Sequence, residues 1–290
     1  MPPLFVLIWS TGFIVARFGM PHAPPLSFLC MRYALSALCF GVWVGVTRAA
    51  WPRGRTQWLH LGVTGILMHA GYLGGVWAAV KAGIGAGTVS LLVGLQPVLT
   101  ALWLASTTRR DAADGTPQVT ALQWGGLVLG LAGLTLLVWR KLGVGEITPL
   151  NLALAVFALL CITIGTLYQK RHVEPCDVRT ANLVQLLAAL AVTAPLALLE
   201  REPVVWTTGF MAAMAWSVLG LTLGGSSLLY LLLQRGAATQ VTSLLYLVPP
   251  CTALMAWAFF DEQLSLPMLL GMALTICGVA LVVRKPVRGA

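Results

Sequence analysis

The sequence predicts an all-α membrane protein of ten transmembrane helices, arranged as two inverted five-helix repeats around a central cavity. Three observations predict this fold: an apolar composition, ten apolar runs of membrane-spanning length and an internal duplication. Of the 290 residues, 58% are hydrophobic and only 9% are charged, whereas a soluble domain carries about 25% charged residues. Because so apolar a chain cannot cover itself with polar surface, a lipid bilayer is its expected partner.

The apolar runs place the individual spans. A run of about 20 apolar residues is long enough to cross a bilayer as a helix. The connections between the runs are short, so we expect no soluble domain. The expected spans are residues 3–19, 26–47, 57–80, 86–105, 119–139, 150–170, 178–199, 210–233, 238–260 and 265–284.

The duplication appears when the segment 87–138 is compared with the segment 239–283. Each holds an apolar run with a proline, a polar break, and a second apolar run with two glycines seven residues apart. Such internal repeats define the organisation of a chain. We therefore expect two halves, residues 1–145 and 146–290. The aligned residues are Pro97 with Pro249, Gly126 with Gly271 and Gly133 with Gly278.

The number of spans in each half determines their relative orientation. Five is odd, so the second half enters the membrane from the opposite side, and a two-fold axis in the membrane plane should relate the halves. Lys and Arg in the connections favour the cytoplasmic side, and they divide twelve against five between the two sides. Both termini are therefore predicted to be cytoplasmic.

Several motifs carry a family resemblance. The chain resembles the EamA family of the drug/metabolite transporter superfamily, and within it the YddG type of aromatic amino-acid exporter. The resemblance extends over nearly the whole chain. It implies ten-helix exporters of amino acids and related metabolites in the bacterial inner membrane, with the first span beside the pathway. The motifs are Trp9–Phe13 with Arg17, Pro25, Arg32-Tyr33, Ala79–Lys81, Pro97, Pro249, Asp261–Leu264, Gly271 and Gly278.

The first half departs from this family pattern at one place. Ser106-Thr107-Thr108 stands where the family has an acidic residue after the fourth span, whereas the second half carries Asp261-Glu262. An essential role for this acid is therefore in doubt.

The polar residues inside the spans are the candidates for a transport site. All nine acidic residues lie in connections or at span ends, although proton antiport usually relies on an intramembrane carboxylate. His69 is the one titratable side chain near the middle of a span, and on an α-helix Tyr72 would share its face. His69 could make a structural hydrogen bond between helices or line a cavity. Arg32 could draw a substrate carboxylate, or its side chain could reach the interface or bond to carbonyl groups.

Three groups of residues form the candidate site. The prolines either kink their helices statically or act as hinges, because a proline inside a helix frees a carbonyl group. The expected substrate-binding residues are Trp9, Ser10, Phe13, His69, Tyr72, Ser90, Thr242 and Tyr246. The expected hinges are Pro97, Pro249 and Pro250. The expected charges of the vestibules are Arg17, Arg32, Lys81, Lys170 and Arg235.

These residues favour one function over two alternatives. We expect export of a small metabolite, foremost an amino acid with an apolar or aromatic side chain, by alternating access and facilitated diffusion. A carrier of anionic sugar- or phosphate-linked metabolites and a non-transporting membrane scaffold are the alternatives. No pattern indicates an enzyme, a metal site or a cofactor. The basic connections set orientation, so we expect no nucleic-acid partner, and we take a monomer as the working expectation.

Overall fold

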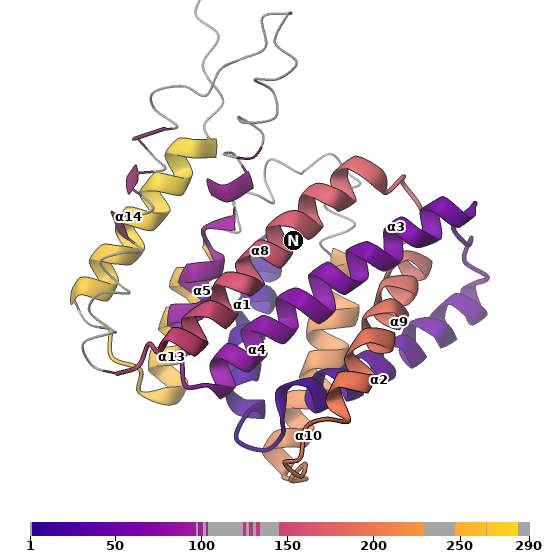
Figure 1. Cartoon of the computed structure of the whole chain (residues 1–290), viewed down its shortest axis with the longest axis horizontal. Helices are drawn as coiled ribbons and strands as arrows, with labels where there is room; N and C mark the ends of the chain where they lie inside the picture. The colour runs from indigo at the N-terminus through magenta and orange to yellow at the C-terminus, as the bar shows by residue number, and fades with distance from the viewer. Residues whose placement is uncertain are drawn as a thin grey trace, which may run out of the picture.

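The computed structural model describes residues 2–96, 98–100, 145–228, 247–264 and 266–283, with a few isolated positions between 103 and 133. All regular structure in these residues is helical, and the helices pack into one bundle (Figure 1). The first half contributes α1 (Pro2–Gly19), α2 (Pro25–Thr47), α3 (Arg55–Gly65), η1 (Ile66–Leu73), α4 (Gly74–Lys81) and α5 (Ala86–Val93). The second half contributes α8 (Pro149–His172), α9 (Val178–Ala197), α10 (Thr208–Ala215), η2 (Trp216–Ser226), α13 (Val248–Phe260) and α14 (Leu266–Val283).

These elements make nine continuous helical rods within the described residues. The elements α3, η1 and α4 form one rod, Arg55–Lys81, and α10 and η2 form another, Thr208–Ser226. The rods match nine of the ten expected spans, while most of the fifth span, 119–139, lies outside the described residues. Five rods are long and apolar enough to cross a membrane: Pro25–Thr47, Arg55–Lys81, Pro149–His172, Val178–Ala197 and Thr208–Ser226.

The outer faces of the rods are apolar. Leu38 and Val46 of α2 are 65% and 79% exposed, and Leu219 of η2 and Trp257 of α13 are also exposed. In water such a surface would aggregate, whereas in a bilayer it contacts lipid at no cost. The arrangement of exposed side chains thus agrees with the composition in indicating a membrane-embedded bundle.

Aromatic rings fill the contact between α2, α4 and α10. Phe28 stacks on Trp77 with a centroid distance of 4.3 Å, and it meets Phe210 edge-on at 5.5 Å. All three side chains are buried. Elsewhere a small residue lets helices approach, because a Cβ atom on Gly65 of α3 would lie 2.3 Å from the carbonyl oxygen of Gln185 in α9. In Figure 1, α8 lies beside α3 and α4, with which it packs.

One end of the bundle is held together by polar contacts between connections. The ammonium group of Lys81 donates to the carbonyl of Met20 at 3.1 Å and pairs with Glu202 at 2.7 Å. The amide of Val205 donates to the carbonyl of His22 at 2.8 Å. We call this the Lys81 end. It gathers the connections 20–24, 82–85, 145–148, 198–207 and 261–264.

The opposite end joins the connections 48–54 and 173–177, and we call it the Arg179 end. The hydroxyl of Thr180 donates to the carbonyl of Ala50 at 2.9 Å, and the side chain of Gln57 donates to the carbonyl of Glu174 at 2.9 Å. Among the described residues, successive connections therefore alternate between the two ends. A chain that crosses a membrane repeatedly requires this alternation.

Candidate functional site

The third rod of the first half and the corresponding rod of the second half share an unusual winding. Each contains a π-helical segment, η1 over Ile66–Leu73 and η2 over Trp216–Ser226. A π-helix bonds residue i to residue i+5, is rare, and is frequent at functional sites. The glycine pair Gly74-Gly75 follows η1 as its first α-helical residues, and the pair Gly224-Gly225, 150 positions later, lies near the end of η2. The two halves thus carry the same feature at equivalent places.

The π-winding changes one expectation about His69 and Tyr72. The sequence predicts an α-helix, in which residues three apart share a face, but both residues lie in η1. The wider turn separates them, so Tyr72 is buried while His69 is half-buried. Close packing on α8 accompanies this winding, because a Cβ atom on Gly71 would lie 2.7 Å from the Sγ of Cys161.

Polar side chains from four rods meet beside η1. The Nε of Arg32 in α2 donates to the Oγ1 of Thr222 in η2 at 3.1 Å. The hydroxyl of Tyr33 donates to the carbonyl of His69 at 2.8 Å, and the two rings meet edge-on with centroids 6.0 Å apart. Gln185 of α9 supplies a side-chain hydrogen bond to His69, and Tyr72 is an electrostatic neighbour of Arg32. We call these residues the Arg32 cluster: Arg32, Tyr33, His69, Tyr72, Gln185 and Thr222.

Other expected site residues lie apart from the Arg32 cluster. The hydroxyl of Ser10 in α1 donates to the carbonyl of Val6 at 2.7 Å and lies 3.4 Å from that of Val248. The hydroxyl of Ser90 in α5 donates to the carbonyl of Gly87 at 2.8 Å. Both hydroxyls are thus used by nearby backbone, and both residues are buried.

The two aromatic candidates of the first span also lie in α1. Phe13 is buried in the core, and Trp9 packs its ring 5.3 Å from that of Phe5. Four further candidates fall outside the described residues: Pro97, Arg235, Thr242 and Tyr246.

Within the described residues, Pro249 and Pro250 stand at a helix start; residues 229–246 before them lie outside the described residues, so their role as an interruption or hinge of the ninth span stays a prediction. They occupy the first turn of α13, which begins at Val248. The first amide groups of a helix have no intrahelical acceptor, so proline costs little there. The fourth rod breaks beside this point: α5 ends at Val93, and a Cβ atom on Gly94 would lie 2.9 Å from the Cγ of Pro249. The break in α5 and the start of α13 therefore pack against each other.

The expected vestibule charges divide between the two ends. Arg17 is in the last turn of α1, and Lys81, with its partners, ends α4, so both lie at the Lys81 end. Lys170 is exposed in the last turn of α8, at the Arg179 end. Arg32, by contrast, is only 6% exposed and lies within the bundle.

The sequence did not indicate the structural roles of two acidic residues, Glu200 and Glu262. The carboxylate of Glu200 accepts from the amides of Leu26 and Ser27, at 3.0 and 2.7 Å, at the start of α2. The carboxylate of Glu262 accepts from the amides of Ala86 and Gly87, at 3.0 and 3.4 Å, at the start of α5. Free amides and the helix dipole both favour a carboxylate there.

Both caps come from the second half and close helices of the first half at the Lys81 end. Glu146 adds a third carboxylate, which accepts from the amide of Gly85 at 3.1 Å and from the hydroxyl of Thr88 at 3.1 Å. In the sequence, the one sign of these caps is an acidic residue in a short connection. The capped amides lie up to 176 positions away, so no local pattern pairs them with the acid.

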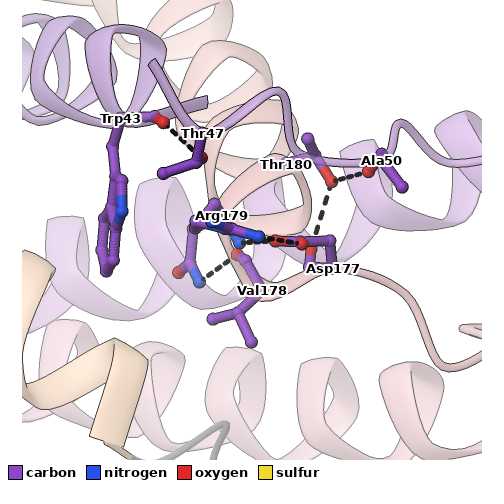
Figure 2. Close-up of polar contacts among 8 residues, drawn as sticks. Trp43, Thr47, Ala50, Asp177, Val178, Arg179 and Thr180 are labelled. Atoms are coloured by element: carbon purple, nitrogen blue, oxygen red, sulfur yellow. Dashed lines mark hydrogen bonds and ion pairs between the residues drawn. The ribbon is translucent and has the colours of Figure 1, made fainter. Parts of the chain in front are cut away.

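Figure 2 shows how the Arg179 end is fixed. Asp177 caps α9, accepting from the amide and the Nε of Arg179, each at 2.9 Å. The guanidinium of Arg179 also lies 5.9 Å from the ring centroid of Trp43 in α2. The hydrogen bond from the side chain of Arg179 keeps the pKa of Asp177 below its ordinary value.

A bundle of apolar, membrane-length rods around a buried polar cluster defines the class of protein as a helical membrane transporter. The chain belongs to the EamA-like transporter family, which matches residues 4–139 and 150–284. The two matched segments show that the chain is a tandem of two units of this family.

Relatives with similar sequences are also described as transporters. One is the "Uncharacterized transporter YvbV" of Bacillus subtilis (strain 168). It is 22% identical over an alignment of 290 positions, with 97% of this chain and 89% of the relative covered. An "Uncharacterized transporter" of Archaeoglobus fulgidus is 24% identical, with 97% and 96% covered. The "Uncharacterized inner membrane transporter YedA" of Escherichia coli (strain K12) is 23% identical, with 95% and 87% covered.

A solved structure gives the same fold. One crystal structure matches this chain with a TM-score of 0.66 at 19% identity, covering 97% of this chain and 94% of the other. At this identity the match shows the fold alone, while the family match identifies a membrane-embedded transporter of the EamA type.

Proposed function

We propose that this transporter exports a small metabolite, foremost an amino acid with an apolar or aromatic side chain, by alternating access. The observation that carries the proposal is the Arg32 cluster, which combines aromatic rings and neutral hydrogen-bonding groups with one cation at the two π-helical segments. Such a lining suits a ligand that is largely apolar and carries a compact polar head. Export is proposed from the resemblance to exporters of this family, and the substrate gradient would set the net direction of a facilitator.

The charge distribution favours facilitated diffusion over coupling to protons. The sequence places no carboxylate in the middle of any expected span, although intramembrane proton relays usually depend on one. Among the described residues of the Arg32 cluster, the candidates for carrying a charge are His69 and Arg32. A zwitterion carries no net charge, so the membrane potential should have little effect on its movement.

An anionic sugar- or phosphate-linked substrate is the rival proposal. Phosphate recognition usually assembles several cationic groups or a bidentate arginine with further donors. Among the described rods, Arg32 is the one buried cation, while Lys81 is paired with Glu202. A single guanidinium balances a monovalent carboxylate better than a phosphate dianion, which supports the amino-acid proposal.

The test is transport by the full-length protein in proteoliposomes loaded with labelled phenylalanine or leucine. We expect saturable efflux down the gradient, and no accumulation when an inward proton gradient is imposed. His69→Gln keeps hydrogen-bonding capacity without titrating, so it should change the rate by no more than about tenfold. His60→Gln is the matched control, because His60 contacts Tyr168 near the Arg179 end.

Two results would contradict parts of this proposal. Accumulation that is driven by the proton gradient and lost in His69→Gln would replace the facilitator with a proton-coupled carrier. Saturable flux of sugar phosphates together with no flux of any amino acid would establish the rival substrate class.

A further inference from the structure

The charge of Arg32 has no counter-ion among the described residues. Both ion pairs found there lie at the ends of the bundle, Lys81 with Glu202 and Arg179 with Asp177. A guanidinium carries five N–H donors, and the described residues use one of them, the Nε that donates to Thr222. A buried charge without a partner is strongly unfavourable. The native protein therefore gains if an anion completes this position.

Two hydroxyl groups on the rod that carries Thr222 lack hydrogen-bond partners. Ser217, Thr222 and Ser227 follow one another at intervals of five residues along η2 and the residue after it, and the π-winding brings Ser217 and Thr222 to one side of the rod. The hydroxyl of Thr222 accepts from Arg32 and donates to the carbonyl of Ser217 at 2.9 Å, whereas the Oγ atoms of Ser217 and Ser227 are buried without a hydrogen-bond partner. We call Ser217, Thr222 and Ser227 the hydroxyl stripe.

The helix that carries Arg32 adds a similar group. Ser36 lies one turn after Arg32 on the same face of α2, and its Oγ is likewise buried without a partner. Buried hydroxyls without partners are rare in folded proteins and need an explanation. Since α2 packs directly on η2, these groups and the cation lie along one contact between the halves of the chain.

The rings near Arg32 limit the kind of anion that fits. Tyr33 is fully buried, and its hydroxyl is already bonded to the carbonyl of His69. Tyr72 is buried, and both tyrosines are electrostatic neighbours of the guanidinium. These rings surround the guanidinium with apolar surface and bring no second positive charge. A monovalent anion with an apolar body matches this surrounding.

We propose that Arg32, held by Thr222, binds the carboxylate of the transported molecule, with Ser217 and Ser227 of the hydroxyl stripe as additional donors, and that the ligand is a monocarboxylate such as an α-amino acid. The inference rests on the proposed function and adds the group that recognises the substrate. The planar guanidinium matches a carboxylate with two parallel hydrogen bonds, which an ammonium group cannot reproduce. Substrate binding thereby bridges α2 of the first half and η2 of the second half.

The test measures binding of L-phenylalanine and of L-phenylalaninamide, which lacks the carboxylate, to the purified full-length protein in nanodiscs. The wild type should bind the acid at least about tenfold more tightly than the amide, because a hydrogen bond to a charged group is lost. Arg32→Gln should weaken binding of the acid roughly 10- to 100-fold and abolish the preference. Lys170→Gln removes an exposed cation at the Arg179 end and should change neither.

Two further variants keep the inference testable if Arg32→Gln does not fold. Arg32→Lys retains the charge without the planar fork, so it should keep part of the preference for the acid. Thr222→Val removes the neighbouring hydroxyl and should weaken binding of the acid more than binding of the amide. Unchanged discrimination between acid and amide in all folded variants would overturn the inference.

Benzoate separates this inference from the proposed function. Binding of benzoate that depends on Arg32, without binding of any amino acid, would support a carboxylate site and overturn the amino-acid proposal. Absence of binding for both carboxylates to the wild type would overturn the carboxylate site itself.

Discussion

Asp177 is a single residue that holds helices together at the Arg179 end of the bundle. It caps α9, and its carboxylate holds the side chain of Arg179, which in turn lies over Trp43 of α2 (Figure 2). One carboxylate therefore joins the start of α9 to the last turns of α2. Because Arg179 lowers the pKa of Asp177, its contribution to stability has a defined dependence on pH.

We predict that Asp177→Ala lowers the stability of the protein by about 1 kcal/mol at neutral pH, the usual cost of losing a helix cap. The folded-state pKa is depressed, so the contribution is complete above the unfolded value of about 3.9 and is lost as the pH falls through the folded value. Thermal unfolding in detergent at pH 7 and near pH 3 measures this difference. The difference between the wild type and Asp177→Ala should be smaller at the lower pH.

Asp177→Asn is the matched control for the pH effect. Asparagine still caps the helix but has no charge to hold Arg179, so the variant should lie between the wild type and Asp177→Ala at neutral pH and vary little with pH. A loss in Asp177→Ala that persists undiminished at acidic pH would show that the carboxylate charge is not involved.

At the scale of helices, carboxylates that cap distant helices connect the two halves at the Lys81 end, beside the ion pair of Lys81 with Glu202. Pro24 precedes α2 and offers no capping side chain, so Glu200 supplies the cap from 174 positions away. Gly85 precedes α5 and likewise has no side chain that could cap it, so Glu262 supplies the cap. In each case the second half completes a helix of the first half.

We predict that Glu262→Ala exposes the first turn of α5. Losing the acceptor should accelerate hydrogen exchange of the Ala86 and Gly87 amides by roughly 5- to 30-fold, which corresponds to about 1–2 kcal/mol. Peptide-level hydrogen exchange measures this effect. Asp261→Asn is the control, because Asp261 is exposed, adopts φ 53°, and asparagine tolerates that conformation.

The first turn of α2 provides an internal reference for the same experiment. Glu200 caps it independently of Glu262, so its exchange should not change in Glu262→Ala. Acceleration spread evenly over both helices would indicate general unfolding rather than loss of one cap.

The spans were predictable from sequence, whereas the details of winding and capping were not. The apolar runs in the sequence predicted all nine rods that the described residues contain, because the length of an apolar run depends only on local composition. The π-winding of η1 coincides with its packing against α8, a contact between distant segments that the local sequence pattern does not show. Glu262 caps α5 from 176 positions away, a contact that depends on the tertiary fold.

The candidate site was predictable only in part for a similar reason. His69, Tyr72 and Arg32 were recognisable as polar groups inside apolar runs, and the structure brings them into one cluster. Tyr33, Gln185 and Thr222 join this cluster through contacts between distant segments. Ser10 and Ser90 looked equivalent to them in sequence, but their hydroxyls bond to nearby carbonyls.

At the scale of the whole molecule, the alternation of connections does not decide which end of the bundle faces the cytoplasm. The Arg179 end and the Lys81 end must face opposite sides of the membrane, and the distribution of basic residues predicts that the Arg179 end faces the cytoplasm. The end through which a substrate would leave the cytoplasm depends on this prediction.

We predict that, in a background without the six native cysteines, a cysteine at Arg53 reacts with an impermeant thiol reagent only from the cytoplasmic side. A cysteine at Arg201 should react only from outside. Both positions are exposed, at the Arg179 end and the Lys81 end respectively. Labelling of whole cells and of inverted vesicles distinguishes the sides, and the reverse pattern would require the opposite orientation.

The π-winding of η1 also has a mechanical consequence. A π-wound stretch uses more residues per turn than an α-wound one, so a change of winding in η1 would rotate α4 about its own axis relative to α3. At the end of α4, the ammonium group of Lys81 holds the carbonyl of Met20 and the carboxylate of Glu202. Rotation would draw that group away from both. Torsion produced beside His69 would thereby release contacts at the far end of the same rod.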